Sequence, residues 1–153
     1  LPSMAEATPP KTRSAKKPAI RREQPESGEC ARHRIRIEVS TSYASEQSRP
    51  QEGQYAFSYT ITIRNEGGVP ARLLTRRWVI TDANGKVKEV RGEGVVGEQP
   101  HLAPGQGFRY SSAAVLETPV GVMQGSYQML ADDGRRFEAP IAPFTLAVPG
   151  MLH

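Results

Sequence analysis

Hydrophobic and polar residues alternate along most of the chain from residue 35 onward. The alternation is strictest in residues 55–63, where Tyr, Phe and Ile stand at every second position with small or polar residues between them. A period of two places successive side chains on opposite faces of a strand. This segment therefore predicts a β-strand with one face in a core and the other in water. Residues 35–39, 108–114 and 144–148 repeat the pattern.

Turn-forming residues separate the alternating segments. Asn-Gly at 84–85 and Asp-Gly at 133–134 each stand between two of them. Such dipeptides favour two-residue hairpin turns, because both positions tolerate a positive φ. Pro140 and Pro143 interrupt the last part of the chain. They indicate an edge strand or a bend, since proline cannot donate a hydrogen bond to a sheet. No segment predicts a helix.

These signals predict an all-β fold with seven or eight short strands. We expect an antiparallel β-sandwich of the immunoglobulin or fibronectin type III kind. Trp78 is expected in the core of this sandwich, on a strand face that it shares with Leu74, Arg76 and Ile80. The alternative for this tryptophan is an exposed anchor in an interface, beside Arg77.

Tyr127 begins a predicted strand directly after the turn at Gly125. A tyrosine in this place can form a tyrosine corner, in which its hydroxyl bonds to the backbone a few residues upstream. It can equally be an ordinary core tyrosine. The residues alone leave both roles open.

The first 33 residues differ from the rest in composition and charge. They are rich in Pro, Ala, Lys, Arg and Glu. Such a segment cannot bury enough apolar surface to offset its chain entropy. We therefore predict a disordered basic tail over residues 1–33 and one folded domain over residues 34–153. Residues 1–34 carry eight Lys and Arg against four Glu, and the remaining 12 basic and 12 acidic residues balance. The net charge of +4 thus belongs to the tail.

Charge, hydropathy and cysteine content limit the expected partners and location. The tail allows electrostatic contact with nucleic acid or anionic lipid, although a solvated tail is the simpler interpretation. Nucleic acid is expected nowhere else. No apolar run approaches the about 18 residues of a membrane helix, and no signal-peptide segment is evident. The single cysteine, Cys30, excludes an internal disulfide and fits a reducing compartment. We expect a cytoplasmic protein that does not contact a membrane.

Catalytic and metal-binding constellations are not evident. His33, His101 and His153 are far apart in sequence and lack the spacing of metal ligands. The aspartates at 132–133 lie in a predicted hairpin turn, where Asp suits the backbone geometry. Three scattered histidines and Cys30 give no Ser-His-Asp or Cys-His arrangement. We therefore expect no metal, no cofactor and no enzymatic activity.

Residues 92–97, GEGVVG, match the Gly-x-Gly-x-x-Gly pattern of a dinucleotide-binding loop. That site requires a helix whose N-terminus binds the pyrophosphate. Here the prolines and glycines of residues 98–107 forbid a helix. A phosphate-binding P-loop requires a lysine after the last glycine, and none follows. The pattern match therefore lacks the context of either nucleotide site.

Two interpretations of this loop remain. In the favoured one, the glycines allow a tight or bulged connection, with Val95 and Val96 packed into the core. In the alternative, backbone N–H groups and a neighbouring cation bind an anion or a nucleotide. Glu93 and Glu98 oppose this alternative, because they place two negative charges in the same loop. The residues of the alternative site are Arg91, Gly92, Gly94 and Gly97.

Four stretches give the chain a specific resemblance. They are RRWVITDANG from residue 76, GEGVVGEQP from 92, LAPGQGFRYSS from 102 and TPVGVMQGSYQM from 118. They resemble the ApaG family, also called CorD, over residues 35–148. The resemblance implies a fibronectin-like β-sandwich in a bacterial cytosolic protein. It also implies a gene near a diadenosine tetraphosphate hydrolase and a genetic link to cobalt and magnesium resistance.

The resemblance also bears on function. The same domain is appended to eukaryotic F-box proteins and to a polymerase-delta-interacting protein, which implies a binding module. The family has no established catalytic residues, so none is implied here. We therefore predict a non-enzymatic module that binds a protein partner, through the loops at its ends or through an exposed edge strand. The alternative is a small-ligand module that binds a nucleotide or pyrophosphate at residues 92–97. The partner and the oligomeric state are left open.

Overall fold

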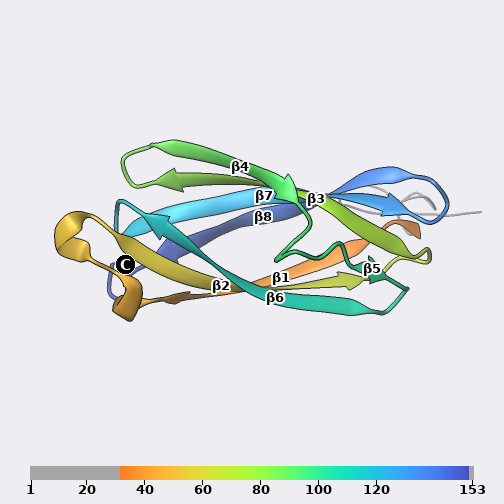
Figure 1. Ribbon diagram of the computed structural model, residues 1–153, viewed down its shortest axis with the longest axis horizontal. Helices are drawn as coiled ribbons and strands as arrows, with labels where there is room; N and C mark the ends of the chain where they lie inside the picture. Colours follow the sequence, from red (N-terminus) through yellow and green to blue (C-terminus); the bar gives the residue numbers. More distant parts are fainter. Residues whose placement is uncertain (1–31, 152–153) are drawn as a thin grey trace, which may run out of the picture. The chain divides into compact units, whose positions relative to one another are not determined.

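The computed structural model describes residues 32–151, and Figure 1 shows the arrangement of the strands. The predicted tail lies outside the described residues, apart from residues 32 and 33. Two short 3₁₀ turns, η1 (Ser45–Gln47) and η2 (Pro50–Glu52), follow the first strand. The strands are β1 (Ile35–Tyr43), β2 (Tyr55–Asn65), β3 (Ala71–Asp82), β4 (Val87–Glu93), β5 (His101–Leu102), β6 (Gly107–Leu116), β7 (Val120–Ala131) and β8 (Arg136–Ala147).

The strands form two antiparallel sheets. One sheet has the order β1-β2-β6, and the other has the order β4-β3-β7-β8, with the short β5 pairing with β3. The sheets lie as two layers, with β2 and β6 in one and β3, β4 and β7 in the other (Figure 1). The predicted antiparallel β-sandwich is therefore confirmed. Its finer assignment to the immunoglobulin or fibronectin type III kind stays a prediction.

The alternating residues of β2 supply the centre of the core, as the sequence predicts. Phe57, Tyr59, Ile61 and Ile63 are all buried. Trp78 is also buried, and its ring meets neighbouring aromatic rings at tilted or edge-on angles. The centroid separations from Trp78 are 5.7 Å to Tyr59, 5.9 Å to Phe144 and 6.4 Å to Tyr127. Such geometries are favourable for aromatic pairs. The prediction of a core tryptophan is confirmed.

Both predicted hairpins are present, but their turns have three residues, and only the glycine of each dipeptide has a positive φ. The N–H of Asp82 donates to the carbonyl of Lys86 at 3.0 Å, and the N–H of Ala131 donates to the carbonyl of Arg135 at 2.8 Å. Gly85, between β3 and β4, has a φ of +83°, and Gly134, between β7 and β8, has a φ of +89°. Both angles lie in the left-handed region that favours glycine. Pro140 falls within β8, which pairs only with β7 and forms an edge of its sheet. The edge interpretation of the C-terminal prolines is therefore confirmed.

Strict alternation fails in β3, where the pairing with β7 shifts by one residue. Leu73 pairs with Met129 and Thr75 pairs with Gln128, so Leu74 is an extra residue between them. A bulge of this kind changes which side chains face inward. Leu73 is fully buried, while Leu74 is half-buried. The expected pairing of Leu74 with Trp78 on one core face is corrected in this way.

The role of Tyr127 is also settled. Its side chain is fully buried, and its hydroxyl shares a hydrogen bond of 2.5 Å with the hydroxyl of Tyr110 on the opposite sheet. The partner is a side chain and not an upstream backbone group. The tyrosine-corner interpretation is therefore wrong, and Tyr127 is a core tyrosine whose hydroxyl is bonded across the sandwich.

Candidate functional site

The loop after β4 folds back on itself as a tight turn. The N–H of Val95 donates to the carbonyl of Glu98 at 2.8 Å, and the N–H of Glu98 donates to the carbonyl of Val95 at 2.9 Å. The two residues between them, Val96 and Gly97, have φ values of +44° and +81°. Two successive positive φ values are typical of a type I′ turn. The loop is thus a hairpin-like connection with its own hydrogen bonds.

Gly94 occupies a position that admits no side chain. Its φ is +62°, and an added Cβ would overlap the carbonyl oxygen of Glu98. Its N–H donates to the carbonyl of Leu74 at 2.8 Å. The N–H groups of residues 94, 95 and 98 are therefore bound within the protein. This geometry supports the interpretation in which the glycines form a tight connection, and the anion or nucleotide alternative stays a prediction.

Arg91 and Gly92 lie on opposite faces of β4. Arg91 is exposed and pairs with Glu89 at 2.9 Å on the solvent side. The pKa of Glu89 is held below its usual range, first by a hydrogen bond from Arg77 and then by the charges of both arginines. Gly92 lies opposite Arg76 of β3, and an added Cβ would lie 2.7 Å from the guanidinium carbon of that arginine. The structure therefore brings Arg76, and not Arg91, to the inner side of the loop.

One part of the predicted loop packing is wrong. Val95 is fully buried in the core, as expected, but Val96 is 55% exposed. The type I′ turn explains the difference, because Val96 is a central turn residue and points out of the domain while Val95 precedes the turn and points in. The exposed Val96 lines the mouth of a small pocket instead.

This pocket, which we call the Arg76 pocket, lies between the two sheets beneath the turn. Its volume is about 140 Å³. The Arg76 guanidinium is fixed at its edge, because Nη1 donates to the carbonyls of Glu93 at 2.9 Å and Gly94 at 2.8 Å. In the described residues 32–151, no acidic side chain forms an ion pair with Arg76. The lining residues are Tyr59, Arg76, Trp78, Val95, Val96, Tyr110 and Ser112.

Tyrosine hydroxyls make the floor of this region polar but uncharged. Burial raises the pKa of Tyr110 to about 12, and burial together with the adjacent Tyr110 hydroxyl raises the pKa of Tyr127. Both side chains therefore keep their protons at neutral pH. The positive charge of Arg76 is consequently the one full charge among the residues that line the pocket.

β6 is an edge strand without the usual protection against pairing. Natural edges are protected by charged residues, prolines, bulges or very short length. β1 carries Arg36 and Glu38, β4 carries four charged residues, β8 carries two prolines, and β5 is two residues long. β6 spans ten residues, GFRYSSAAVL, with Arg109 as its single charge and no proline. Of the edge strands that the structure describes, β6 is thus the one most open to a further strand.

The pairing of β6 with β2 shows which backbone groups are available. The N–H of Asn65 donates to the carbonyl of Gln106, so Asn65 and Gln106 form a hydrogen-bonded pair. The next pair along the strands is Arg64 with Gly107. Hydrogen-bonded pairs alternate with non-hydrogen-bonded pairs, so the bonds to β2 fall at even-numbered residues of β6. The odd-numbered residues direct their N–H and C=O groups to the unpaired side. Beyond Gly107, the first residue of the strand, they are Arg109, Ser111, Ala113 and Val115, and no other described segment donates a backbone bond to these four.

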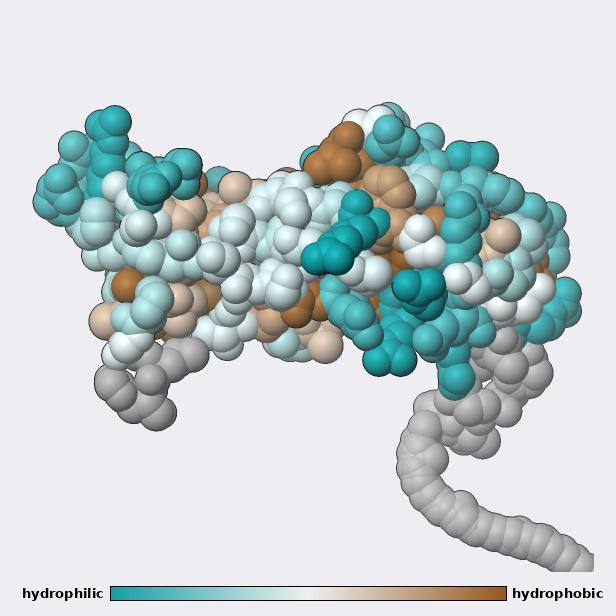
Figure 2. All heavy atoms as spheres, turned by 90° about the horizontal axis from the view of Figure 1, so that it is seen from below, coloured by the Kyte–Doolittle hydropathy of each residue, from teal (hydrophilic) through white to brown (hydrophobic). Residues whose placement is uncertain are grey.

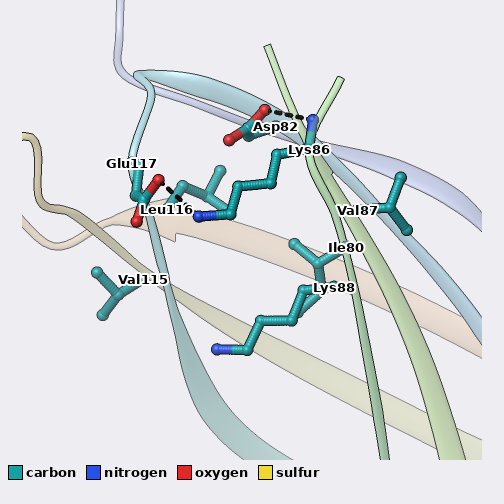
Figure 3. A pocket seen from close by; sticks show the side chains of 8 residues that line it. All are labelled: Ile80, Asp82, Lys86, Val87, Lys88, Val115, Leu116 and Glu117. Atoms are coloured by element: carbon teal, nitrogen blue, oxygen red, sulfur yellow. Dashed lines mark hydrogen bonds and ion pairs between the residues drawn. The ribbon is translucent and has the colours of Figure 1, made fainter. Parts of the chain in front are cut away.

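Beside the end of β6 lies an open groove, which we call the Ile80 groove. Its volume is about 320 Å³, and Figure 3 shows its side chains, with Ile80 and Lys88 from one sheet facing Val115 and Leu116 from the other. Lys86 reaches across to Glu117 at 3.1 Å. Val87 and Val115 at its rim are 61% and 62% exposed. The groove and the Arg76 pocket thus both adjoin β6.

The outer face of the three-stranded sheet has a different character. Its side chains are largely hydroxyl groups, and Thr60 and Ser111 bond to each other at 2.8 Å. Figure 2 looks at the domain from this side and shows mostly pale and teal residues, with hydrophobic ones in small separate patches. The Arg76 pocket and the Ile80 groove therefore lie on the side where β4 and β6 approach each other. A third depression, of about 390 Å³, lies on the outer face and is lined by Glu38, Thr62, Arg64, Gly107, Phe108 and Arg109.

The histidines do not assemble a metal site. His101 contacts Asp132 at 2.9 Å and His33 contacts Asp133 at 2.9 Å, so the fold brings two histidines to the β7–β8 hairpin. Within the described part of the chain, however, no group of three or more His, Cys, Asp or Glu residues is close enough to hold a metal ion. Cys30 lies outside the described residues. No described helix has the length and hydrophobicity needed to span a bilayer.

Sequence patterns identify only part of this region. They place Arg76 on the same strand face as Trp78, and they identify β6 as a strand. They do not show that Arg76 lies against Gly92, because this contact depends on the register of β3 with β4. One sequence feature does point to the free edge of β6. Residues 110–116, YSSAAVL, carry no charge, whereas the edge strands β1 and β4 carry charged residues.

Fold and site together define an antiparallel β-sandwich domain with one unprotected edge strand and two concave features beside it. The family model described as ApaG domain matches residues 45–131. Protein ApaG of Ectopseudomonas mendocina (strain ymp) is 61% identical over 122 residues, which cover 80% of this chain and 97% of that protein. Protein ApaG of Methylococcus capsulatus (strain Bath) is 60% identical over 121 residues, with 79% and 96% covered. The chain belongs to the ApaG family.

The solved structures agree with this assignment. A crystal structure of an ApaA protein from Bordetella pertussis matches with a TM-score of 0.76 and 47% identity, over 78% of this chain and 97% of that one. The names of these relatives state no activity, ligand or partner. The function must therefore be argued from the residues of the domain.

Proposed function

We propose that the domain is a non-enzymatic, cytoplasmic binding module that adds an extended segment of a partner protein to the free edge of β6. The observation that carries this proposal is that Arg109, Ser111, Ala113 and Val115 have backbone groups that face the free edge, in a strand of ten residues with one charge and no proline. In such recognition, main-chain hydrogen bonds supply affinity and pockets for alternate side chains supply specificity.

The packing of β6 supports an added strand. Its inward-facing residues Phe108, Ser112 and Ala114 are only half-buried, because no further strand of this sheet covers that side. A partner strand paired with β6 would place every second side chain over this incompletely covered edge of the core. The added burial of apolar surface would contribute to binding in addition to the backbone bonds.

Ala113 allows a direct test, because its N–H faces the free edge and its side chain is exposed. Ala113→Pro removes one outward donor without removing a bond to β2. Ala113→Val is the matched control, since it has a similar size, keeps the N–H and favours a strand. Random 12-residue peptides displayed on phage are selected against the unmodified domain, and the dissociation constants of the enriched peptides are then measured with both variants.

We expect Ala113→Pro to weaken peptide binding at least about tenfold, because one main-chain bond is lost and its carbonyl partner is left unpaired. Ala113→Val should bind nearly as well as the unmodified domain. Equal binding by all three proteins would refute the edge-strand proposal. A dimer of the unmodified domain that Ala113→Pro dissociates would also contradict it, since the occupant of the edge would then be a second copy of the chain. Circular dichroism and thermal melting check that both variants fold.

A further inference from the structure

Arg76 is an unusual group to find at the edge of a core. A guanidinium that is partly removed from water is normally paired with a carboxylate, because burying an uncompensated charge is costly. Here the side chain is half-buried, and its hydrogen bonds to the described residues both come from one nitrogen, Nη1, which donates to the carbonyls of Glu93 and Gly94. Among the described residues, Nε and Nη2 have no hydrogen-bond or ion-pair partner.

The surroundings hold this guanidinium in place without neutralising it. Gly92 leaves room for it, since a Cβ there would lie 2.7 Å from both the guanidinium carbon and Nη2. The pocket beside it also offers the hydroxyl of Ser112. A fixed guanidinium next to a hydroxyl donor is suited to a planar carboxylate, which accepts paired hydrogen bonds from arginine. The volume of about 140 Å³ admits a side-chain carboxylate but not a nucleotide.

The position of the pocket relates it to the β6 edge. Ser112 and Tyr110, which line the pocket, are inward-facing residues of β6. A strand added to β6 would place the side chains opposite these residues on the same inward face, because cross-strand neighbours share a face. The side chain opposite Ser112 would therefore point toward the Arg76 pocket. The residue opposite Leu116 would point toward the Ile80 groove, which Leu116 lines.

We propose that the Arg76 pocket is the specificity site for an acidic side chain of the added strand, with an apolar side chain four residues away in the Ile80 groove. This inference rests on the proposed function and specifies the chemistry of its partner. Ser112 and Leu116 are four positions apart in β6, and a strand rises about 3.3 Å per residue. The partner segment is thus an extended peptide in which Asp or Glu and an aliphatic residue stand at positions i and i+4 in either order.

The test uses the peptides selected on the unmodified domain and their matched amide forms, in which Asp is replaced by Asn or Glu by Gln. Affinities are measured by isothermal titration calorimetry for the unmodified domain and for three variants. Arg76→Gln removes the charge. Gly92→Ala leaves Arg76 in the chain but displaces its guanidinium, the far end of a flexible side chain. Arg109→Gln is the matched control, because Arg109 is on the same strand edge but faces outward.

We expect the acidic peptide to bind the unmodified domain about tenfold to a hundredfold more tightly than its amide form, as a charge-assisted hydrogen bond requires. This preference should fall below about threefold in Arg76→Gln and in Gly92→Ala, and it should persist in Arg109→Gln. It should also survive 0.5 M NaCl, since a partly buried pair is screened much less than an exposed one.

The outcomes separate this inference from the function on which it rests. Selected peptides that bind through β6 but show no acidic preference, or a preference that Arg76→Gln leaves unchanged, would overturn the inference and leave edge-strand binding intact. Loss of the preference in Arg109→Gln or in salt would overturn it too, because the attraction would then be a general charge effect. Failure to select any peptide that Ala113→Pro weakens would overturn both proposals.

Discussion

The Gly94→Ala substitution tests the structural role of the glycine loop most sharply. A left-handed backbone costs a residue with a side chain about 1–2 kcal/mol, and Gly94 has a φ of +62°. The added Cβ would also overlap the Glu98 carbonyl oxygen and lie 3.0 Å from the Glu98 carbonyl carbon. Because these are backbone atoms, the turn itself must move, and overpacking of this kind costs about 1–3 kcal/mol. We expect a total loss of about 2–5 kcal/mol in the free energy of unfolding.

Gly97 supplies the matched control within the same turn. Its φ is +81°, but an added Cβ would meet nothing within 4 Å. Gly97→Ala should therefore cost only the backbone term of about 1–2 kcal/mol. Urea unfolding followed by circular dichroism measures both variants, with equal m-values as the check that the transitions are comparable. If Gly94→Ala is no less stable than Gly97→Ala, the contact with Glu98 relaxes without cost and the reasoning from this geometry is wrong.

Three further predictions concern the core. Tyr127→Phe should lower the free energy of unfolding by about 1–3 kcal/mol in urea melts, because the buried Tyr110 hydroxyl loses its partner; an unchanged midpoint would contradict this. Stability should fall as the pH rises from about 10 through about 12, because the folded-state pKa of Tyr110 is raised to about 12 and deprotonation favours the unfolded chain. Tyr110→Phe should flatten that pH dependence. Gly125→Ala should lower the free energy of unfolding by about 3 kcal/mol or more, because its Cβ would overlap the Arg77 carbonyl oxygen. A urea unfolding midpoint close to that of the unmodified domain would refute this.

The strands were predictable because their signals are local. Alternation in residues 55–63 and the Asn-Gly and Asp-Gly turns depend on neighbouring residues only, and the structure confirms them. The inward face of Trp78 and Arg76 followed from the same alternation. Features that depend on how distant strands align were missed. The bulge at Leu74 requires the register of β3 with β7, and the exposure of Val96 requires the type I′ turn.

The candidate site was less accessible from sequence for the same reason. The pattern GEGVVG draws attention to Arg91, which is next to it in the chain. The three-dimensional neighbour of Gly92 is instead Arg76, 16 positions earlier, which the β3–β4 pairing brings beside it. The unprotected edge of β6 becomes visible only when the strand order shows that β6 has β2 as its one partner in the sheet. A long strand with a single charge in an otherwise polar chain is a sequence feature that can indicate an open sheet edge in other proteins of this size.

Amide hydrogen exchange, resolved by residue with NMR, tests the proposed binding mode most directly. The exchange rates of the domain are compared with and without a saturating selected peptide. Edge-strand addition predicts new protection at Arg109, Ser111, Ala113 and Val115, whose N–H groups face the free edge, while the even-numbered amides of β6 change little because they already bond to β2. Protection confined to the loop of residues 94–98 or to β4, with the odd-numbered amides of β6 unchanged, would contradict the account.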